Sequence, residues 1–290
     1  MDARDIKEIP PVVEDGRYLE AIYSLQKELI DHYVGIEGLP QYPLDVNTKK
    51  NQLLIKDFVG RVIEELAEGY ESFKLVGEIT EKNQLWFNGD YNNEYVQMLN
   101  HLQNANEEQA DALHFMVELL IFANIQPEDI DSYCNRIYDN LNQHTLTLTT
   151  NTLHKAGMIG YHLLKMDNGL EGNWSEIINS QVNLLSLLDS DKDISLIKGG
   201  SLYSSHSYLE MKSNMWDIVY HLNIARNYLK NKPWKQSQMM TNESAFQEEL
   251  VKAFIKLIGY FYTLGLMSED IYPLYFKKQR VNKFRIHSNY

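Results

Sequence analysis

Two pairs of acidic residues are spaced so that each pair could hold a cation. Glu65 and Glu68 are three residues apart, and so are Glu108 and Asp111. In an α-helix, residues three apart lie on the same face, so each pair projects from one side of its helix. Packing the two faces together would gather four carboxylates, an arrangement that mutual repulsion makes unfavourable without a cation. Hard divalent cations such as Mg²⁺ prefer oxygen ligands, so we expect the cluster to bind metal.

The spacing alone is weak support for a metal site. The chain has 40 acidic residues among 290, so chance supplies about five or six acidic pairs at this spacing on ordinary solvated helix faces. The residues that flank the pairs must therefore decide between a metal site and an exposed charged surface.

A basic stripe near the end of the chain is typical of phosphate binding. Lys278, Asn282 and Arg285 share one face of a helix because they are spaced i, i+4 and i+7. Residues 277–285 contain five basic residues and no acid, in a chain of net charge −13. The stripe can clamp phosphate through Arg285 and Lys278, with Asn282 bonding sugar or phosphate. The alternative is a solvated helix end whose cations complement the helix dipole.

Two residues that follow Asp111 could contact a nucleotide base. His114 and Phe115 lie three and four residues later, on nearly the same helix face. Phe115 can pack against a base and His114 can lie beside it. A histidine on an apolar helix is more commonly a hydrogen-bonded core residue, and this reading stays open.

Four segments, in order along the chain, resemble the motifs of one enzyme family. They are QKEL (26–29), ELAE (65–68), EQADALHF (108–115) and KKQRVNKFR (277–285). Together they are similar to the dimeric dUTPases, a branch of the all-α nucleoside triphosphate pyrophosphatases, and the chain looks most like a bacteriophage member. One departure is Ile30, which stands where the family usually has Asn in its base pocket.

The resemblance implies an activity and a set of roles. A homodimer would hydrolyse dUTP, or also dUDP, to dUMP, which keeps uracil out of DNA and supplies dUMP for thymidylate synthesis. Two or more Mg²⁺ ions per site, for which Mn²⁺ can substitute, would be held by the four carboxylates, with Glu65 orienting the attacking water. Gln26 would help to form the base pocket with His114 and Phe115. Because Ile30 removes a polar group, a dCTP or dual dCTP/dUTP pyrophosphatase is the alternative enzyme. A helical protein-binding regulator with a vestigial metal site is the alternative of another class.

The elements that must position these residues are predicted to be helices. Tyr18, Ile22 and Leu25 recur at helical spacing, and Gly38-Leu39-Pro40 ends the run. Similar patterns predict an all-α, bundle-like fold with helices at 16–34, 48–77, 106–124, 213–231, 242–264 and 268–286.

The middle of the chain is harder to interpret. Residues 139–152 alternate Leu with Thr and fit either a short strand or a loop. Further helices are expected at 153–166 and 173–188, and the breaker-rich segment 189–207 is the best linker candidate. We therefore expect one catalytic domain over 1–290, with an inserted or elaborated region at about 130–210.

Composition limits the class of protein and its partners. A chain of 290 residues and 33.9 kDa with 44% hydrophobic residues can bury a real core. The charge of −13 argues against nucleic acid or anionic membrane as a partner. A small anionic substrate would need a metal ion or local basic residues at its binding site. The single Cys134 fits a reducing compartment, so we expect a cytoplasmic protein, in the host cytoplasm if phage-encoded. The most apolar stretch, Leu113–Ile125, is short and carries Glu118, so no membrane span is expected.

Overall fold

The structure, a computed structural model, describes residues 5–13, 17–82, 92–143, 205–231, 236, 239–264, 266 and 268–288. Their regular elements are all α-helices, which confirms the all-α prediction. In chain order these are α1 (Tyr18–Glu37), α2 (Lys49–Lys82), α3 (Asn92–Phe122), α4 (Pro127–Gln143), α7 (Ser205–Tyr228), α8 (Glu243–Thr263) and α9 (Ser268–His287).

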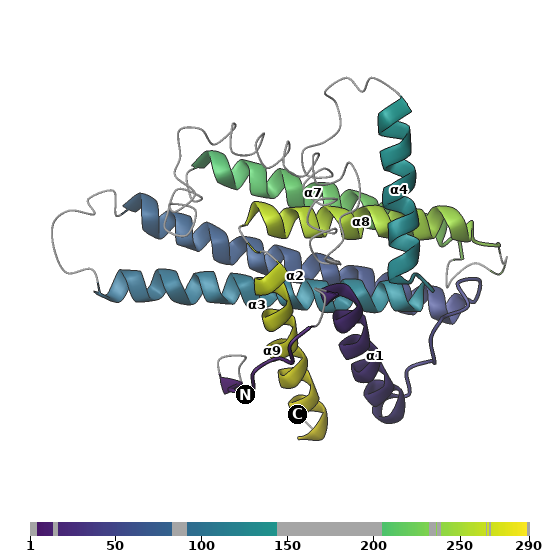
Figure 1. Ribbon diagram of the computed structural model, residues 1–290, viewed down its shortest axis with the longest axis horizontal. Coiled ribbons are helices and arrows are strands. Elements are labelled where there is room, and N and C mark those ends of the chain that lie inside the picture. Colours follow the sequence, from purple (N-terminus) through teal and green to yellow (C-terminus); the bar gives the residue numbers. More distant parts are fainter. Residues whose placement is uncertain are drawn as a thin grey trace.

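The long helices α2 and α3 form the central pair and lie side by side along most of their length (Figure 1). Both bury apolar residues at helical spacing, such as Val62 and Leu66 of α2 and Leu113 and Val117 of α3. Gly69 permits a close approach, because a Cβ built there would lie 2.1 Å from Nε2 of the buried Gln109. This close packing holds the two predicted acidic pairs against each other.

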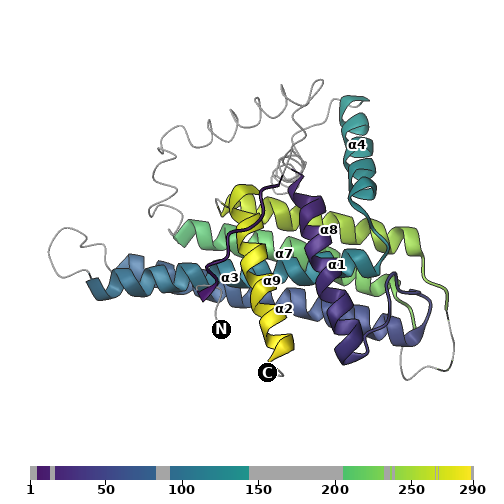
Figure 2. The same cartoon turned by 60° about the horizontal axis from the view of Figure 1, so that its bottom comes forward.

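The other helices cover opposite sides of the central pair. Helices α7 and α8 pack together on one side, while α1 and α9 cross the other side at a steep angle (Figures 1 and 2). One continuous core joins all seven described helices, and it includes Ile22, Phe58, Leu120, Ile218 and Phe254. Helices α1, α2, α3 and α9 therefore meet on one side of the molecule, where the candidate site lies.

Helix caps explain several of the observed ends. Gly38 has φ 65° in the left-handed region, which ends α1. The Thr48 hydroxyl accepts a hydrogen bond from the Asn51 amide at the start of α2, and the Asn242 carboxamide oxygen accepts one from Ala245 at the start of α8.

The predicted helices agree with the structure best at the end of the chain. The predicted ranges 242–264 and 268–286 differ from α8 and α9 by one residue at most. Helix α3 begins at Asn92, whereas the sequence predicts a start at 106. The first turns of α3 are polar and leave Val96 and Leu99 exposed, so no buried apolar face marks them in the sequence. Helix α2 likewise runs on to Lys82, beyond the predicted end at 77.

The middle of the chain needs two corrections. Residues 139–143, which fitted a strand or a loop, are the last turn of α4, a helix that was not predicted. Residues 205–207, assigned to the linker, begin α7. The predicted helices at 153–166 and 173–188, with the rest of the linker and of the region 130–210 between α4 and α7, lie outside the described residues.

Within the described residues, no helix is both long enough and apolar enough to cross a membrane.

Candidate active site

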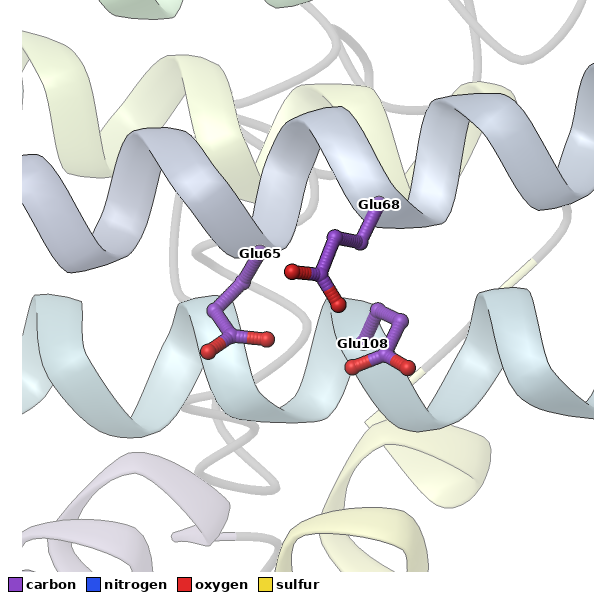
Figure 3. Close-up of side chains that lie close together, drawn as sticks. All are labelled: Glu65, Glu68 and Glu108. Atoms are coloured by element: carbon purple, nitrogen blue, oxygen red, sulfur yellow. The ribbon is translucent and has the colours of Figure 1, made fainter.

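Three of the four predicted carboxylates form a cluster. Glu65 and Glu68 reach from α2 toward Glu108 of α3 (Figure 3). One carboxylate oxygen from each lies within 4.8 Å of the others. Glu65 and Glu108 are partly buried and Glu68 is exposed. The cluster is therefore open to solvent on one side and backed by the helix pair on the other.

The electrostatics of the cluster favour a bound cation. The pKa of Glu65 rises to about 8 because of burial, the charge of Asp111, and a hydrogen bond and repulsion from Glu108. The pKa of Asp111 rises to about 6, mainly through burial, although Lys278 opposes the shift. Their surroundings therefore make the charged forms of both carboxylates energetically unfavourable. A hard divalent cation would relieve that cost, so the donor set fits the predicted Mg²⁺ or Mn²⁺.

Asp111 lies beside the cluster and is paired with the basic helix α9. Its Oδ2 is 2.6 Å from Nζ of Lys278. Burial alone would lower the pKa of Lys278, but the charge of Asp111 and its hydrogen bond raise it above the usual value. Lys278, predicted as a phosphate ligand, is 8% exposed and here neutralises a predicted metal ligand. It brings positive charge to the edge of the cluster without lining the adjoining pocket.

A pocket of about 250 Å³ opens next to the cluster. Seven of the ten predicted site residues line it: Gln26, Glu65, Asp111, His114, Phe115, Asn282 and Arg285. Of the other three, Glu68 and Glu108 belong to the carboxylate cluster, and Lys278 forms the ion pair with Asp111. Residues that are far apart in the sequence are thus gathered from α1, α2, α3 and α9. A larger hollow of about 550 Å³ lies along α7, but the described residues that line it all belong to α7 and include none of the carboxylate cluster.

His114 is a buried, hydrogen-bonded residue of the pocket wall. Its Nδ1 is 2.9 Å from Oε1 of Gln26, its Nε2 is 3.1 Å from the carbonyl oxygen of Tyr275, and its ring stacks on Tyr275 at 3.7 Å. Burial lowers the pKa of His114 to about 3, so the imidazole is neutral at physiological pH. His114 is therefore a hydrogen-bonded core residue that also borders the pocket, and its contact with a nucleotide base stays a prediction.

Aromatic and aliphatic side chains form the rest of the wall. Phe115 meets Phe58 edge to face at 5.9 Å, and the Arg61 guanidinium lies 5.5 Å from the Phe115 ring centroid. From α1, Leu29 and Tyr33 line the pocket. Ile30, expected to replace a polar group of the base pocket, is instead fully buried in the core. The polarity of the pocket is therefore set by other residues.

Sequence reasoning missed two charged residues of the pocket. Arg61 lies one turn before Glu65 on α2, and Glu118 lies two turns after Asp111 on α3. Both spacings were visible in the sequence, since i−4 and i+7 place each residue on the same helix face as a predicted ligand. In the sequence, Glu118 stands out only as a charge that interrupts an apolar stretch.

Comparison of the chain with known protein families, with curated proteins and with solved structures finds no match in any of the three. Its function must be inferred from the motifs and from the site itself.

Proposed function

We propose that the protein is a divalent-metal-dependent hydrolase that converts a pyrimidine deoxynucleoside triphosphate to its monophosphate. The motif resemblance makes dUTP the expected substrate and a homodimer with an all-α nucleoside triphosphate pyrophosphatase fold the expected form. One observation carries the proposal. Glu65 belongs to both the carboxylate cluster and the pocket wall, and Asp111 lines the pocket beside the cluster, so a nucleotide held in the pocket can extend its phosphates over the acids.

The residues around the cluster have complementary parts in this reaction. Glu65, Glu68, Glu108 and Asp111 would hold the cations, which supply charge for the phosphate oxygens and make a water molecule more acidic. Glu65 is partly buried beside three other acids and also borders the pocket, so in the metal-bound site its carboxylate could orient the water molecule and accept its proton. Lys278 offsets part of the negative charge through Asp111.

The pocket suits the nucleoside end of the substrate. Its volume of about 250 Å³ is below the roughly 300–1,000 Å³ of sites that enclose a whole drug-sized ligand. A base and sugar therefore fit inside while the phosphates lie outside. Phe115 offers an aromatic surface for the base, and Asn282 and Arg285 border the pocket from α9. Arg285 is exposed, so its guanidinium is available for charge-assisted bonds to phosphate.

Hydrolysis of dCTP is a second candidate, because the buried carboxylate of Glu118 lines the pocket. The alternative of a protein-binding regulator with a vestigial metal site is disfavoured by the intact acids at all four positions.

A turnover assay tests the proposal. The purified protein is incubated with saturating Mg²⁺ and a panel of dUTP, dCTP, dTTP, dATP, dGTP and dUDP, and release of pyrophosphate and phosphate is measured. We expect pyrimidine triphosphates to be hydrolysed, with activity lost in EDTA and restored by Mg²⁺ or Mn²⁺. Absence of hydrolysis for every nucleotide would refute the enzyme and support the regulator.

A further inference from the structure

Glu118 is a buried acid at the end of the pocket away from the metal cluster. It is 4% exposed and lies on the pocket wall. It follows Asp111 by seven residues on α3, or two helical turns of about 5.4 Å each. A nucleotide with its phosphates over the cluster would place the edge of its base toward Glu118.

The contacts of Glu118 make it the polar group best placed to read a base. Gln26 donates a hydrogen bond from Nε2 to Oε2 of Glu118 at 3.0 Å. The other end of the Gln26 amide, Oε1, accepts a hydrogen bond from the Tyr275 hydroxyl and faces His114. Both ends of the amide are therefore bound to protein groups, so Gln26 acts as a positioning residue that holds the Glu118 carboxylate.

The charge of Glu118 determines which base edge it accepts. An ionised carboxylate only accepts hydrogen bonds, and it can accept several at once. Cytosine carries an exocyclic amino group, which donates, where uracil carries a carbonyl oxygen, which accepts. Carboxylates recognise cytosine by accepting from this amino group, whereas a carbonyl oxygen would face the carboxylate with no proton between them.

We propose that Glu118 reads the base and selects a pyrimidine with an exocyclic amino group, so that dCTP is preferred over dUTP. This inference rests on the proposed function and names the substrate of that site. Phe115 supplies a surface that both bases can share and so does not affect the choice.

The first test uses the wild-type protein and three nucleotides that differ at ring position 4, of which only uracil also carries a hydrogen on the neighbouring N3. These are dCTP, dUTP, and the triphosphate of 2-pyrimidinone deoxyriboside, which has hydrogen in place of the amino or carbonyl group. We expect kcat/KM to fall in the order dCTP, 2-pyrimidinone, dUTP, with about tenfold to hundredfold between the first and the last. A preference for dUTP over dCTP would overturn the inference.

The second test uses Glu118→Gln, which keeps the size of the side chain and adds an NH₂ donor. Its amide can still accept from Gln26 while donating to the uracil carbonyl. We expect the dCTP/dUTP ratio of kcat/KM to fall by about tenfold or more. Glu71→Gln is the matched control, because Glu71 lies on an exposed face of α2 and pairs with Lys74. It should leave the ratio unchanged. An unchanged ratio in Glu118→Gln overturns the inference while the hydrolase proposal stands.

Binding separates failure of this inference from failure of the proposed function. Calorimetry with the α,β-imido analogues of dCTP and dUTP in Mg²⁺ does not require turnover. If the wild-type protein hydrolyses nothing, the hydrolase proposal fails, and tenfold tighter binding of the dCTP analogue would still support the reading by Glu118. Equal binding, or tighter binding of the dUTP analogue, would overturn it. Because these measurements need only the wild-type protein, they decide the question even if Glu118→Gln does not fold.

Discussion

The carboxylates of the cluster experience two opposing influences. Burial and mutual repulsion raise the pKa of Glu65 and of Asp111, whereas Lys278 stabilises the charged form of Asp111. Removing a carboxylate therefore has different consequences at different positions. Loss of Glu68 relieves repulsion, but loss of the Asp111 charge leaves a buried cation without its counter-ion.

Glu68→Gln and Asp111→Asn should both abolish hydrolysis but differ in their effect on stability. Each removes a charge that would hold the metal. In EDTA, Glu68→Gln should unfold at the wild-type temperature or above, because Glu68 is exposed and its charge repels Glu65. Asp111→Asn should lose about 1–3 kcal/mol of stability, because Lys278 is left without its partner. Activity assays and thermal unfolding by circular dichroism measure the two effects.

Near-normal turnover of either variant in saturating Mg²⁺ would refute the metal-site assignment. Glu71→Gln, on the exposed face of α2, is the control for the general effect of losing one negative charge.

At the scale of residues, the sequence predicts which side chains could form the site, but it does not predict which residues those side chains contact. The acidic pairs and the α9 stripe follow from helical spacing, because a helix fixes which residues share a face. The Lys278–Asp111 ion pair joins positions 167 residues apart, and the Gln26–Glu118 bond joins positions 92 residues apart. Such contacts depend on how helices pack, so the helical spacing could not show which residues Lys278 and Glu118 would contact.

At the scale of elements, α9 presents different residues to the pocket and to α1. Asn282 and Arg285 line the pocket, while Lys283 pairs with Glu28 of α1. Gln279 also faces α1, where its amide donates to the Leu25 carbonyl oxygen and to Glu28 at 3.3 Å. One face of α9 thus fixes the helix and another serves the site.

Arg285→Ala should reduce kcat/KM for the triphosphate by about tenfold to hundredfold. The variant loses a charge-assisted hydrogen bond to phosphate, and such a bond contributes roughly 1.5–3 kcal/mol. Its stability should change by no more than about 1 kcal/mol, because Arg285 is exposed. Lys283→Ala removes the same charge from another face of the same helix. Steady-state kinetics of both variants should show a loss for Arg285→Ala alone. Equal losses would mean that α9 acts only by diffuse attraction, which added salt would weaken.

The start of α2 is joined to the α7–α8 connection by a buried amide. Gln52 donates from Nε2 to the Val46 carbonyl oxygen at 2.8 Å and to the Thr241 hydroxyl at 3.0 Å. Its Oε1 accepts from the Asn231 amide at 3.0 Å. One fully buried side chain therefore satisfies polar groups of three segments.

Gln52→Leu should destabilise the protein by about 2–4 kcal/mol, because several buried polar groups lose their partner at once. Chemical denaturation, with the midpoint and slope fitted separately, measures this cost. Asn51→Leu is the neighbouring control, since Asn51 bonds the exposed Asp45 carbonyl oxygen, and it should cost less. Equal costs would show that the Gln52 bonds contribute no more than a surface contact.

Helices whose ends are marked by capping or breaking residues could be predicted closely from the sequence. Helices α8 and α9 were predicted closely, because Gly265 and the polar residues near 241 and 268 mark their ends. The first turns of α3 are exposed, so no apolar periodicity marks them in the sequence. Helix α4, in contrast, buries Ile130, Tyr133 and Cys134 at helical spacing, a pattern that sequence reasoning missed.

At the scale of the whole molecule, the site exists only where two layers meet. The acids, together with His114 and Phe115, come from the central pair, and Gln26, Asn282 and Arg285 come from the α1–α9 layer that crosses it (Figure 2). Site formation is therefore coupled to global folding, and a cation that binds the folded cluster should stabilise the entire protein.

Stability in EDTA should fall as the pH rises from 6.5 to 8. The pKa of Glu65 is raised from 4.5 to about 8 in the folded protein. Between these values the folded state retains a proton that the unfolded chain has released, so raising the pH favours unfolding. Asp111, with its pKa raised from 3.8 to about 6, acts in the same direction at lower pH. His114 acts in the opposite direction, because its lowered pKa costs stability only below about 6.5. Of these three groups, Glu65 therefore contributes most to the change in stability between pH 6.5 and 8.

The dependence on pH and metal can be measured by thermal unfolding of wild-type protein and Glu65→Gln at pH 6.5 and 8, each in EDTA and in Mg²⁺. In EDTA, the unfolding temperature of the variant should rise relative to wild type between pH 6.5 and 8, because the amide cannot ionise. Mg²⁺ should raise the wild-type unfolding temperature more at pH 8 than at pH 6.5, since the cation competes with the proton for the same carboxylate. Glu65→Gln should show a smaller response to Mg²⁺ at both pH values. If Mg²⁺ shifts both proteins equally, and by the same amount at either pH, the cation binds elsewhere and Glu65 is not a ligand.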